Sequence, residues 1–169
     1  MKDKFIPAFM DVAERFAQLS SAKRAQVGAI VVKDNRIISI GYNGMPSGWD
    51  NNCEMPVYPT SKQLDFMPTE TLAEKFPFRD DQGEAYRLMT KPEVLHAESN
   101  ALAKLARCTE SALDATLFVT HEPCIDCAKM IYQAGINTVY FKHEYRSAKG
   151  SGADFLTKSG VKVIHVKRN

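Results

Sequence analysis

The N-terminal part of the chain changes from a helical to a strand-like pattern of hydrophobic positions. Large apolar residues recur every three or four positions over residues 5–19, which is the period of an amphipathic helix. Two β-branched runs follow at 27–32 and 37–42, and the polar residues 33–36 separate them. A short polar segment between two such runs is typical of a hairpin connection. The pattern therefore predicts one helix and then two hairpin strands.

Helical and strand-like patterns alternate in the rest of the chain. We expect one helix that begins at His96 and another that begins at Pro123 and ends near Gly135. We expect strands at 117–120 and 139–141, and then a final helix at 154–158 and a final strand at 161–166. This order predicts an α/β fold with three αβα layers, in which a mixed five-stranded sheet has helices on both faces. With 169 residues, 44% of them hydrophobic, residues 1–169 are expected to form a single domain.

Residues 50–94 do not fit this alternation. The segment is too long for an unstructured connection inside a compact domain. Residues 71–74 have the form of a capping box with Pro77 as a helix stop, and residues 83–89 predict another short helix. The prolines and aromatic residues favour an ordered excursion that packs on a face of the domain or on a neighbouring subunit. A solvated insertion without function remains the alternative.

Charge and cysteine content narrow the function classes. The 22 basic and 20 acidic side chains leave a net charge of +2, which is weak for binding a long nucleic acid and suits a mononucleotide better. The four cysteines show no disulfide framework. No apolar run is long enough to span a membrane, and the N-terminal helix carries too many charges for a signal peptide. We therefore expect a cytoplasmic protein without a membrane partner.

The strongest chemical signal is His96-x-Glu98 followed by Pro123-Cys124-x-x-Cys127. One imidazole and two thiols are zinc ligands, and three protein ligands leave a fourth position for water, as catalytic sites require. Glu98 then serves as a proton carrier rather than a ligand. The pattern H-x-E…P-C-x-x-C is the signature of zinc nucleobase deaminases.

Local geometry makes this metal centre plausible. Cys124 and Cys127 lie three positions apart, so a helix places both sulfurs on one face. Pro123 suits the first position of the helix that carries the two cysteines. His96 stands at the start of the other predicted helix, the one that comes earlier in the chain. Two helix N-termini would therefore face the metal, and their partial positive charge favours thiolates.

A closed structural zinc site is the competing interpretation. Its fourth ligand could come from Cys53, His121, His143 or His165. Cys108 is excluded, because a continuous helix would place it about 18 Å from His96. A chance match to the motif is the other alternative.

Beyond the zinc motif, three stretches carry a family resemblance: Gln26-Val27-Gly28-Ala29, Gly41-Tyr42-Asn43-Gly44-Met45-Pro46-Ser47-Gly48, and the segment from Cys127 to Ile136. With them, the chain resembles the deoxycytidylate (dCMP) deaminases of the cytidine deaminase superfamily. The resemblance implies a cytidine-deaminase-like fold and zinc-dependent hydrolysis of dCMP to dUMP and ammonia. In that reaction His96, Cys124 and Cys127 hold one Zn²⁺ per chain and Glu98 transfers protons.

The resemblance also suggests residues that contact the substrate. Asn43 would touch the sugar or base and Ala29 would line the base pocket, although Asn43 is equally explained by turn chemistry. The 5′-phosphate would be met by a polar basic turn and by a second set of residues beyond the fourth strand: Ser20, Ser21, Lys23 and Arg24, then Tyr145 and Arg146. A basic turn is also an ordinary solvated surface.

Many dCMP deaminases are hexamers that dCTP activates and dTTP inhibits, with Mg²⁺ on the triphosphate effector. By resemblance, this allosteric site would comprise Gly41, Tyr42, Asn43, Gly44, Gly48, Asp50 and Asn51. An ordinary turn would have the same composition. The resemblance therefore implies a regulated homo-oligomer with dCMP as substrate and with dCTP and dTTP as effectors.

Rival functions remain within and outside this chemistry. The chain could deaminate dCTP, cytidine or a base in a nucleic acid, although the low net charge disfavours the last. An inactive zinc module that acts as a regulatory subunit is the non-enzyme alternative. The intact Glu98 argues against it.

Overall fold

The computed structural model describes residues 2–145 and 149–167. Its main sheet has the strand order β2-β1-β6-β7-β8, with β1 (Gly28–Lys33), β2 (Arg36–Tyr42), β6 (Thr116–His121), β7 (Thr138–His143) and β8 (Lys162–His165). Strand β1 runs antiparallel to β2 and β6, whereas β6, β7 and β8 run parallel. The predicted mixed five-stranded sheet is therefore confirmed.

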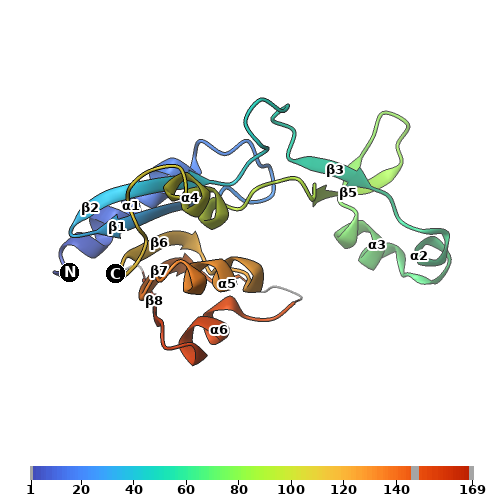
Figure 1. The fold of residues 1–169 in the computed structure, drawn as a ribbon. Coiled ribbons are helices and arrows are strands. Elements are labelled where there is room, and N and C mark those ends of the chain that lie inside the picture. Colours follow the sequence, from blue (N-terminus) through green and yellow to red (C-terminus); the bar gives the residue numbers. More distant parts are fainter. Residues whose placement is uncertain (1, 146–148, 168–169) are drawn as a thin grey trace.

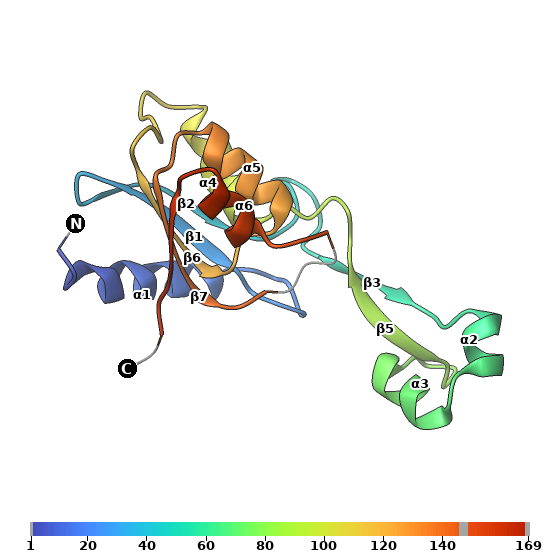
Figure 2. The ribbon, with the colours of Figure 1, turned by 90° about the horizontal axis from the view of Figure 1, so that it is seen from below.

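Helices cover both faces of this sheet, as Figures 1 and 2 show. Helix α1 (Phe5–Ala17) lies on one face, and α4 (Ala97–Leu105), α5 (Ile125–Gln133) and α6 (Gly152–Lys158) lie on the other. Successive side chains of β1 point to opposite faces of the sheet, since Ile30 packs with α1 whereas Val31 packs with α4 and α5. The strand is buried on both faces, which explains its continuous apolar sequence. The predicted three-layer α/β architecture is confirmed.

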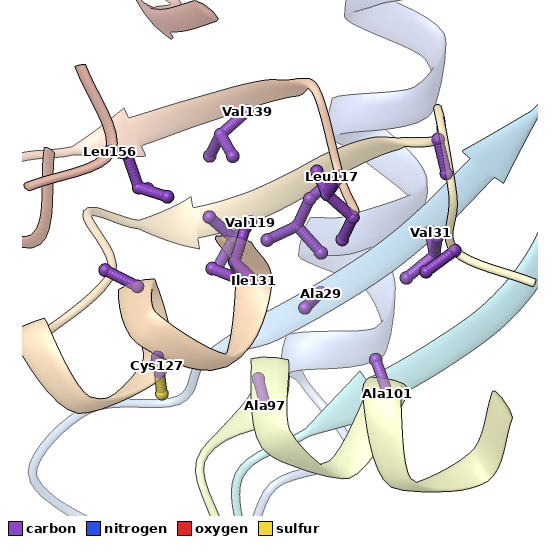
Figure 3. Close-up of a cluster of buried hydrophobic side chains, with 14 of the residues drawn as sticks. Ala29, Val31, Ala97, Ala101, Leu117, Val119, Cys127, Ile131, Val139 and Leu156 are labelled. Carbon is purple, nitrogen blue, oxygen red and sulfur yellow. The ribbon is translucent and has the colours of Figure 1, made fainter. Parts of the chain in front are cut away.

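The larger core lies between the sheet and the α4–α5 layer. Figure 3 shows Ala97 and Ala101 of α4 and Ile131 of α5 directed toward the strands. The alanines are small enough to let α4 approach closely. An added Cβ at Gly41 of β2 would lie 2.1 Å from the carbonyl oxygen of Ala97, so only glycine fits there. This contact fixes the position of the N-terminal turn of α4.

The predicted boundaries of the main sheet and its helices agree with the structure to within about two residues, but Pro123 does not have the predicted position in α5. The sequence analysis placed Pro123 at the first helical position. The structure instead has Cys124 as the N-cap and Ile125 as the first helical residue, so that prediction was wrong. The reason is that the sulfur of Cys124 accepts a hydrogen bond from the backbone N–H of Cys127 and itself caps the helix. Helix α5 ends at Gln133, close to the predicted end at Gly135.

Residues 54–90 form a separate substructure that we call the arm. It contains β3 (Glu54–Val57), α2 (Ser61–Phe66), α3 (Thr69–Lys75), β4 (Phe78–Arg79) and β5 (Ala85–Thr90). The three strands form an antiparallel sheet of order β3-β5-β4. The arm extends away from the main sheet in both views and covers neither of its faces (Figures 1 and 2). Packing of the excursion on a face of its own domain is therefore not observed.

Two local predictions within the arm were wrong. Residues 83–89 form no helix, because Ala85–Thr90 is the central strand between β3 and β4. The capping box lies at Thr60 and Gln63 instead of at residues 71–74, because α3 already begins at Thr69 after Pro68.

In the part of the chain that the structure describes, no helix combines the length and apolar character needed to cross a membrane.

Candidate metal centre and active site

The predicted zinc ligands lie together at the N-termini of two helices. His96 is the N-cap residue of α4, and Cys124 is the N-cap residue of α5. The Nδ1 atom of His96 lies 3.5 Å from the sulfur of Cys124 and 3.4 Å from the sulfur of Cys127. The ligand atoms of the three residues all lie within 4.8 Å of one another. This arrangement of one imidazole and two thiols fits a single zinc ion.

Among the residues that the structure describes, no fourth potential ligand joins this group. Within residues 2–145 and 149–167, His96, Cys124 and Cys127 form the one cluster of at least three potential metal ligands. Cys53 lies in a separate small core with Ala22 and Val94, so it cannot complete the shell. The arrangement therefore favours an open catalytic centre over the closed structural site that the sequence left possible.

The electrostatics of the two cysteines suit metal binding. The side chain of Cys127 is the main cause that lowers the pKa of Cys124 to about 4, and the neighbouring His96 lowers it further. The same contact with Cys124, together with burial, raises the pKa of Cys127. Cys124 is thus a thiolate at neutral pH, and the thiolate is the form that binds metal.

Glu98 lies beside the cluster in the first turn of α4 and is only 4% exposed. Burial raises the pKa of its carboxyl group to about 7, although the backbone N–H of the residue and the neighbouring His96 oppose this shift. A carboxyl group whose pKa lies near the working pH both accepts and donates protons efficiently. The position and the pKa of Glu98 therefore suit a general acid–base group.

A cavity of about 370 Å³ opens onto this cluster. Its walls include six residues that the sequence analysis selected: Arg24, Asn43, His96, Glu98, Cys124 and Tyr145. Nine further residues complete the lining: Ala22, Ala25, Val27, Glu54, Thr90, Val94, Ala97, His121 and Glu122. A volume of this order is in the range of small-ligand sites.

Asn43 has a structural role at the wall of this cavity. Its side-chain amide donates to the carbonyl oxygen of Ala25 at 2.8 Å, and its side-chain oxygen accepts from the backbone N–H of Val27 at 2.8 Å. These bonds tie the segment before β1 to the end of β2. Asn43 therefore shapes the cavity and also contributes to its surface.

The other predicted substrate residues occupy different positions. Ala29 is fully buried in the core, and Ser20 is 4% exposed with its hydroxyl oxygen bonded to the backbone N–H of Ala22. Ser21 and Lys23 are exposed in the turn beside the cavity. The structure does not bring these four side chains to the cavity wall. Arg146 lies outside the described residues.

The predicted effector segment has a well-defined local structure. Gly44 pairs with Leu95 through two backbone hydrogen bonds, so the segment lies against the residue that precedes His96. Tyr42 packs beneath the ammonium group of Lys104, and Gly48 has a positive φ of 88°. Gly41 has a packing reason of its own, the close approach of α4.

Asp50 and Asn51 follow in an exposed turn. One side-chain oxygen of Asp50 accepts from the backbone N–H of Asn52 at 2.8 Å and lies 4.0 Å from the ammonium nitrogen of Lys91. Asn51 is exposed, and its carbonyl oxygen contacts the sulfur of Cys53.

Sequence reasoning missed the cavity residues that come from the arm and from the end of β6. Glu54 and Thr90 lie far from the zinc motif in the sequence, and nothing in their local pattern marks them as functional. His121 and Glu122 immediately precede Pro123, so their proximity to the motif was an available signal. From the sequence, His121 stands out only as a possible fourth metal ligand.

An open site of one histidine, two cysteines and a buried carboxylate, on a mixed sheet between helices, defines a zinc-binding hydrolytic deaminase. The family model of the "Cytidine and deoxycytidylate deaminase zinc-binding region" matches residues 3–143. The chain therefore belongs to the cytidine and deoxycytidylate deaminase family.

Individual relatives agree with this assignment. Deoxycytidylate deaminase of Enterobacteria phage T4 is 31% identical over 94% of this chain and 88% of its own length. The enzyme of the same name from Mycobacterium phage D29 is 35% identical over 80% of this chain and 92% of its own length. Among solved structures, the chain is similar to the crystal structure of dCMP deaminase from cyanophage S-TIM5 in complex with dCMP and dUMP, with a TM-score of 0.75. The two sequences are 41% identical, and the match covers 98% of this chain and 99% of the cyanophage chain.

Proposed function

We propose that this chain catalyses the hydrolytic deamination of dCMP to dUMP and ammonia, with one zinc ion per chain. The observation that carries the proposal is the cavity whose wall joins His96, Cys124 and Glu98 to Arg24. The reacting carbon of the base would lie at the metal centre, with the 5′-phosphate at the arginine. The similarity to a dCMP deaminase that binds dCMP and dUMP supports this choice of substrate.

His96, Cys124 and Cys127 would hold the zinc ion. Bound zinc supplies a Lewis acid that activates water near neutral pH. The two helix N-termini favour the negative charge of the thiolates. The protein contributes the remaining chemistry through Glu98.

Glu98 would move two protons during the reaction. Water adds to C4 of the cytosine ring, and Glu98 accepts the proton that this water releases and donates it to N3. Glu98 then takes the remaining hydroxyl proton and passes it to the exocyclic amino group. The bond between C4 and this nitrogen breaks, C4 becomes a carbonyl carbon, and ammonia leaves. The near-neutral pKa of Glu98 matches this alternation between base and acid.

Arg24 and Tyr145 would bind the 5′-phosphate from the cavity wall. A guanidinium group forms charge-assisted hydrogen bonds with phosphate oxygens. Lys23 adds positive charge from the same turn, and Ser20 and Ser21 belong to the segment that shapes it. Asn43 would contact the sugar or base while it holds the segment before β1.

Ammonia release from four nucleotides or nucleosides tests the proposal. We expect dCMP to be turned over more efficiently than deoxycytidine, because deoxycytidine offers no phosphate to Arg24. The similarity to a dCMP deaminase leads us to expect dCMP to be preferred over CMP and dCTP as well. Equal activity on deoxycytidine would contradict recognition of the phosphate. A preference for dCTP or for CMP would assign the chain to another deaminase within the family.

We further propose that dCTP activates and dTTP inhibits the enzyme, with Mg²⁺ on the triphosphate. The segment from Gly41 to Asn51 would bind the effector, and its pairing with Leu95 connects it directly to His96. Steady-state kinetics with and without each effector and Mg²⁺ test this proposal. Sigmoidal dependence on dCMP with dTTP opposing it supports a separate site, whereas purely competitive inhibition by dTTP would place it in the active site.

A homo-oligomer, a hexamer by the family resemblance, would provide the shared switch for such regulation. The arm presents large apolar side chains to solvent, among them Leu64 at 54% and Phe66 at 80% exposure. Light scattering of the purified protein should give a mass of several chains, and a monomer would contradict the proposal. A role in nucleotide metabolism agrees with a cytoplasmic location.

A further inference from the structure

The base of the arm is attached directly to the turn that carries Arg24. The carboxylate oxygen Oε1 of Glu54, the first residue of β3, accepts the backbone N–H of Lys23 at 2.8 Å and that of Arg24 at 3.3 Å. One carboxylate oxygen thus receives two consecutive backbone donors. These bonds restrict the backbone of the basic turn.

Thr90 holds the other end of Arg24. Glu54 and Thr90 lie directly opposite each other in the antiparallel pair of β3 and β5. The hydroxyl oxygen of Thr90 accepts a hydrogen bond from Nη1 of Arg24 at 3.2 Å. Two opposed residues of the arm therefore fix both the backbone and the guanidinium group of one residue, and the guanidinium retains further N–H donors for a ligand.

Glu54 is buried, and the cost of burying its carboxylate suggests that the two hydrogen bonds to the turn matter for function. The residue is only 3% exposed, and its second oxygen, Oε2, has no hydrogen-bond partner among the residues that the structure describes. A buried carboxylate that is only partly paired costs stability. An apolar residue would fill the position at lower cost, so the two bonds to the turn are the benefit that the carboxylate provides.

A small apolar contact supports the same attachment. Ala22, in the turn, packs with Cys53 and Val94, the residues that flank the arm, and with Met45. The cavity wall includes Ala22, Glu54 and Thr90 together with Arg24. The base of the arm therefore forms part of the wall of the cavity in which a substrate would bind.

We propose that Glu54 and Thr90 are positioning residues for the substrate phosphate, because together they hold Arg24 at the cavity wall in the orientation that meets it. This inference rests on the proposed function, in which Arg24 binds the 5′-phosphate. It gives the arm a role in the active site of its own chain. The arm would act on phosphate affinity and not on the proton transfers at Glu98.

Steady-state kinetics of matched variants test the proposal, with dCMP and deoxycytidine as substrates at equal zinc content. Glu54→Met removes the acceptor at similar side-chain length, and Glu54→Gln keeps an acceptor oxygen. We expect Glu54→Met to raise KM for dCMP about tenfold, in line with loss of bonds to a charged acceptor, with kcat changed less than about threefold. Glu54→Gln should show a clearly smaller rise. The kcat/KM for deoxycytidine, which lacks the phosphate, should stay within about twofold of wild type.

A second pair of variants keeps the test valid if Glu54→Met fails to fold. Thr90→Val removes the hydroxyl acceptor and should raise KM for dCMP selectively, whereas Thr90→Ser should restore it. In an Arg24→Gln background, both Glu54→Met and Thr90→Val should have little further effect on KM, because they act through Arg24.

The outcomes separate the inference from the proposed function. Equal losses with dCMP and deoxycytidine, or full additivity with Arg24→Gln, would overturn the positioning role and leave dCMP deamination intact. Failure of the wild-type enzyme to release ammonia from dCMP would instead overturn the proposed function itself.

Discussion

His121 and His143 lie directly opposite each other on the parallel strands β6 and β7, with their ring centroids 5.0 Å apart. His121 also lines the cavity, and its Nδ1 atom lies 3.0 Å from the hydroxyl oxygen of Thr120. Burial, and then the positive charge that His143 can carry, lower the pKa of His121 below its usual value of 6.5. His121 is therefore neutral at physiological pH.

We expect the His143→Gln variant to raise the pKa of His121 while leaving it below 6.5. The substitution removes the ring whose electrostatic interaction helps to lower the pKa of His121, but burial, the larger cause, remains. Titration of the imidazole signals by NMR measures the shift directly. An unchanged pKa would show that the two rings do not interact electrostatically.

The same shift predicts how stability depends on pH. Between the folded-state pKa of His121 and 6.5, the unfolded chain binds more protons than the folded chain. The free energy of unfolding therefore falls as the pH drops through this window. The stabilising contribution of a neutral His121 is fully present above the window. Replacing His121 with Gln should reduce this slope in denaturant titrations, and a slope equal to that of wild type would count against the assignment.

Replacing Glu98 with Gln should abolish nearly all turnover while zinc remains bound. The amide keeps the shape of the side chain but cannot carry protons, and general acid–base groups contribute roughly 10² to 10⁴-fold in rate. Ammonia release gives the rate, and elemental analysis gives the zinc content. Wild-type activity in a fully zinc-loaded variant would remove Glu98 from the mechanism.

Replacing Cys124 or His96 with Ala should cost both zinc and stability. The metal would tie the N-termini of α4 and α5 to one point, so its binding free energy adds to folding. We expect the melting temperature to fall by more than about 5 °C, since 1 kcal/mol corresponds to roughly 2–4 °C in a domain of this size.

Cys108→Ala is the matched control for these ligand variants, because Cys108 is exposed and outside the cluster. It should retain one zinc per chain and the wild-type melting temperature. Removal of zinc from the wild-type protein with a chelator should reproduce the loss seen for Cys124→Ala. A ligand variant that binds one zinc with normal affinity would show that the ligand set is wrong.

The main sheet and its helices were predictable because burial imposes a simple pattern on them. Strand β1 is buried on both faces and therefore reads as a continuous apolar run. Helix α1 has one apolar face, and its spacing is visible in the sequence. The cluster of His96, Cys124 and Cys127 was also predictable, because His-x-Glu and Cys-x-x-Cys are short motifs that each stand at the start of a helix.

The arm and its part of the cavity were not predictable in the same way. Residues 85–90 form a partly exposed strand without strict alternation of buried and exposed positions. The spacing of its hydrophobic residues therefore did not distinguish a strand from a helix. Glu54 reaches the turn at Lys23 across 31 positions, and Thr90 reaches Arg24 across 66. Such contacts depend on how the arm joins the domain, which no local pattern contains.

Gly41 gives a final test of how the sheet positions the active site. An added Cβ would meet the carbonyl oxygen of Ala97 at 2.1 Å and the backbone nitrogen of Ala101 at 2.6 Å. Both atoms belong to the backbone of α4, so no side chain can move aside to relieve the clash. We expect Gly41→Ala to lower the free energy of unfolding by about 1–3 kcal/mol, the usual cost of overpacking. The same displacement of α4 should lower kcat, because His96 and Glu98 flank Ala97.

Gly44→Ala is the control for stability, since no heavy atom lies within 4 Å of the added Cβ and Gly44 has no positive φ. Its melting temperature should equal that of wild type within about 1 °C, because a surface substitution of this kind changes stability by less than roughly 0.5 kcal/mol. Chemical denaturation of both variants, together with ammonia release by Gly41→Ala, measures the two effects. If Gly41→Ala were as stable and active as wild type, α4 would have to approach β2 less closely than the structure shows, and the glycine would be free to serve the effector instead.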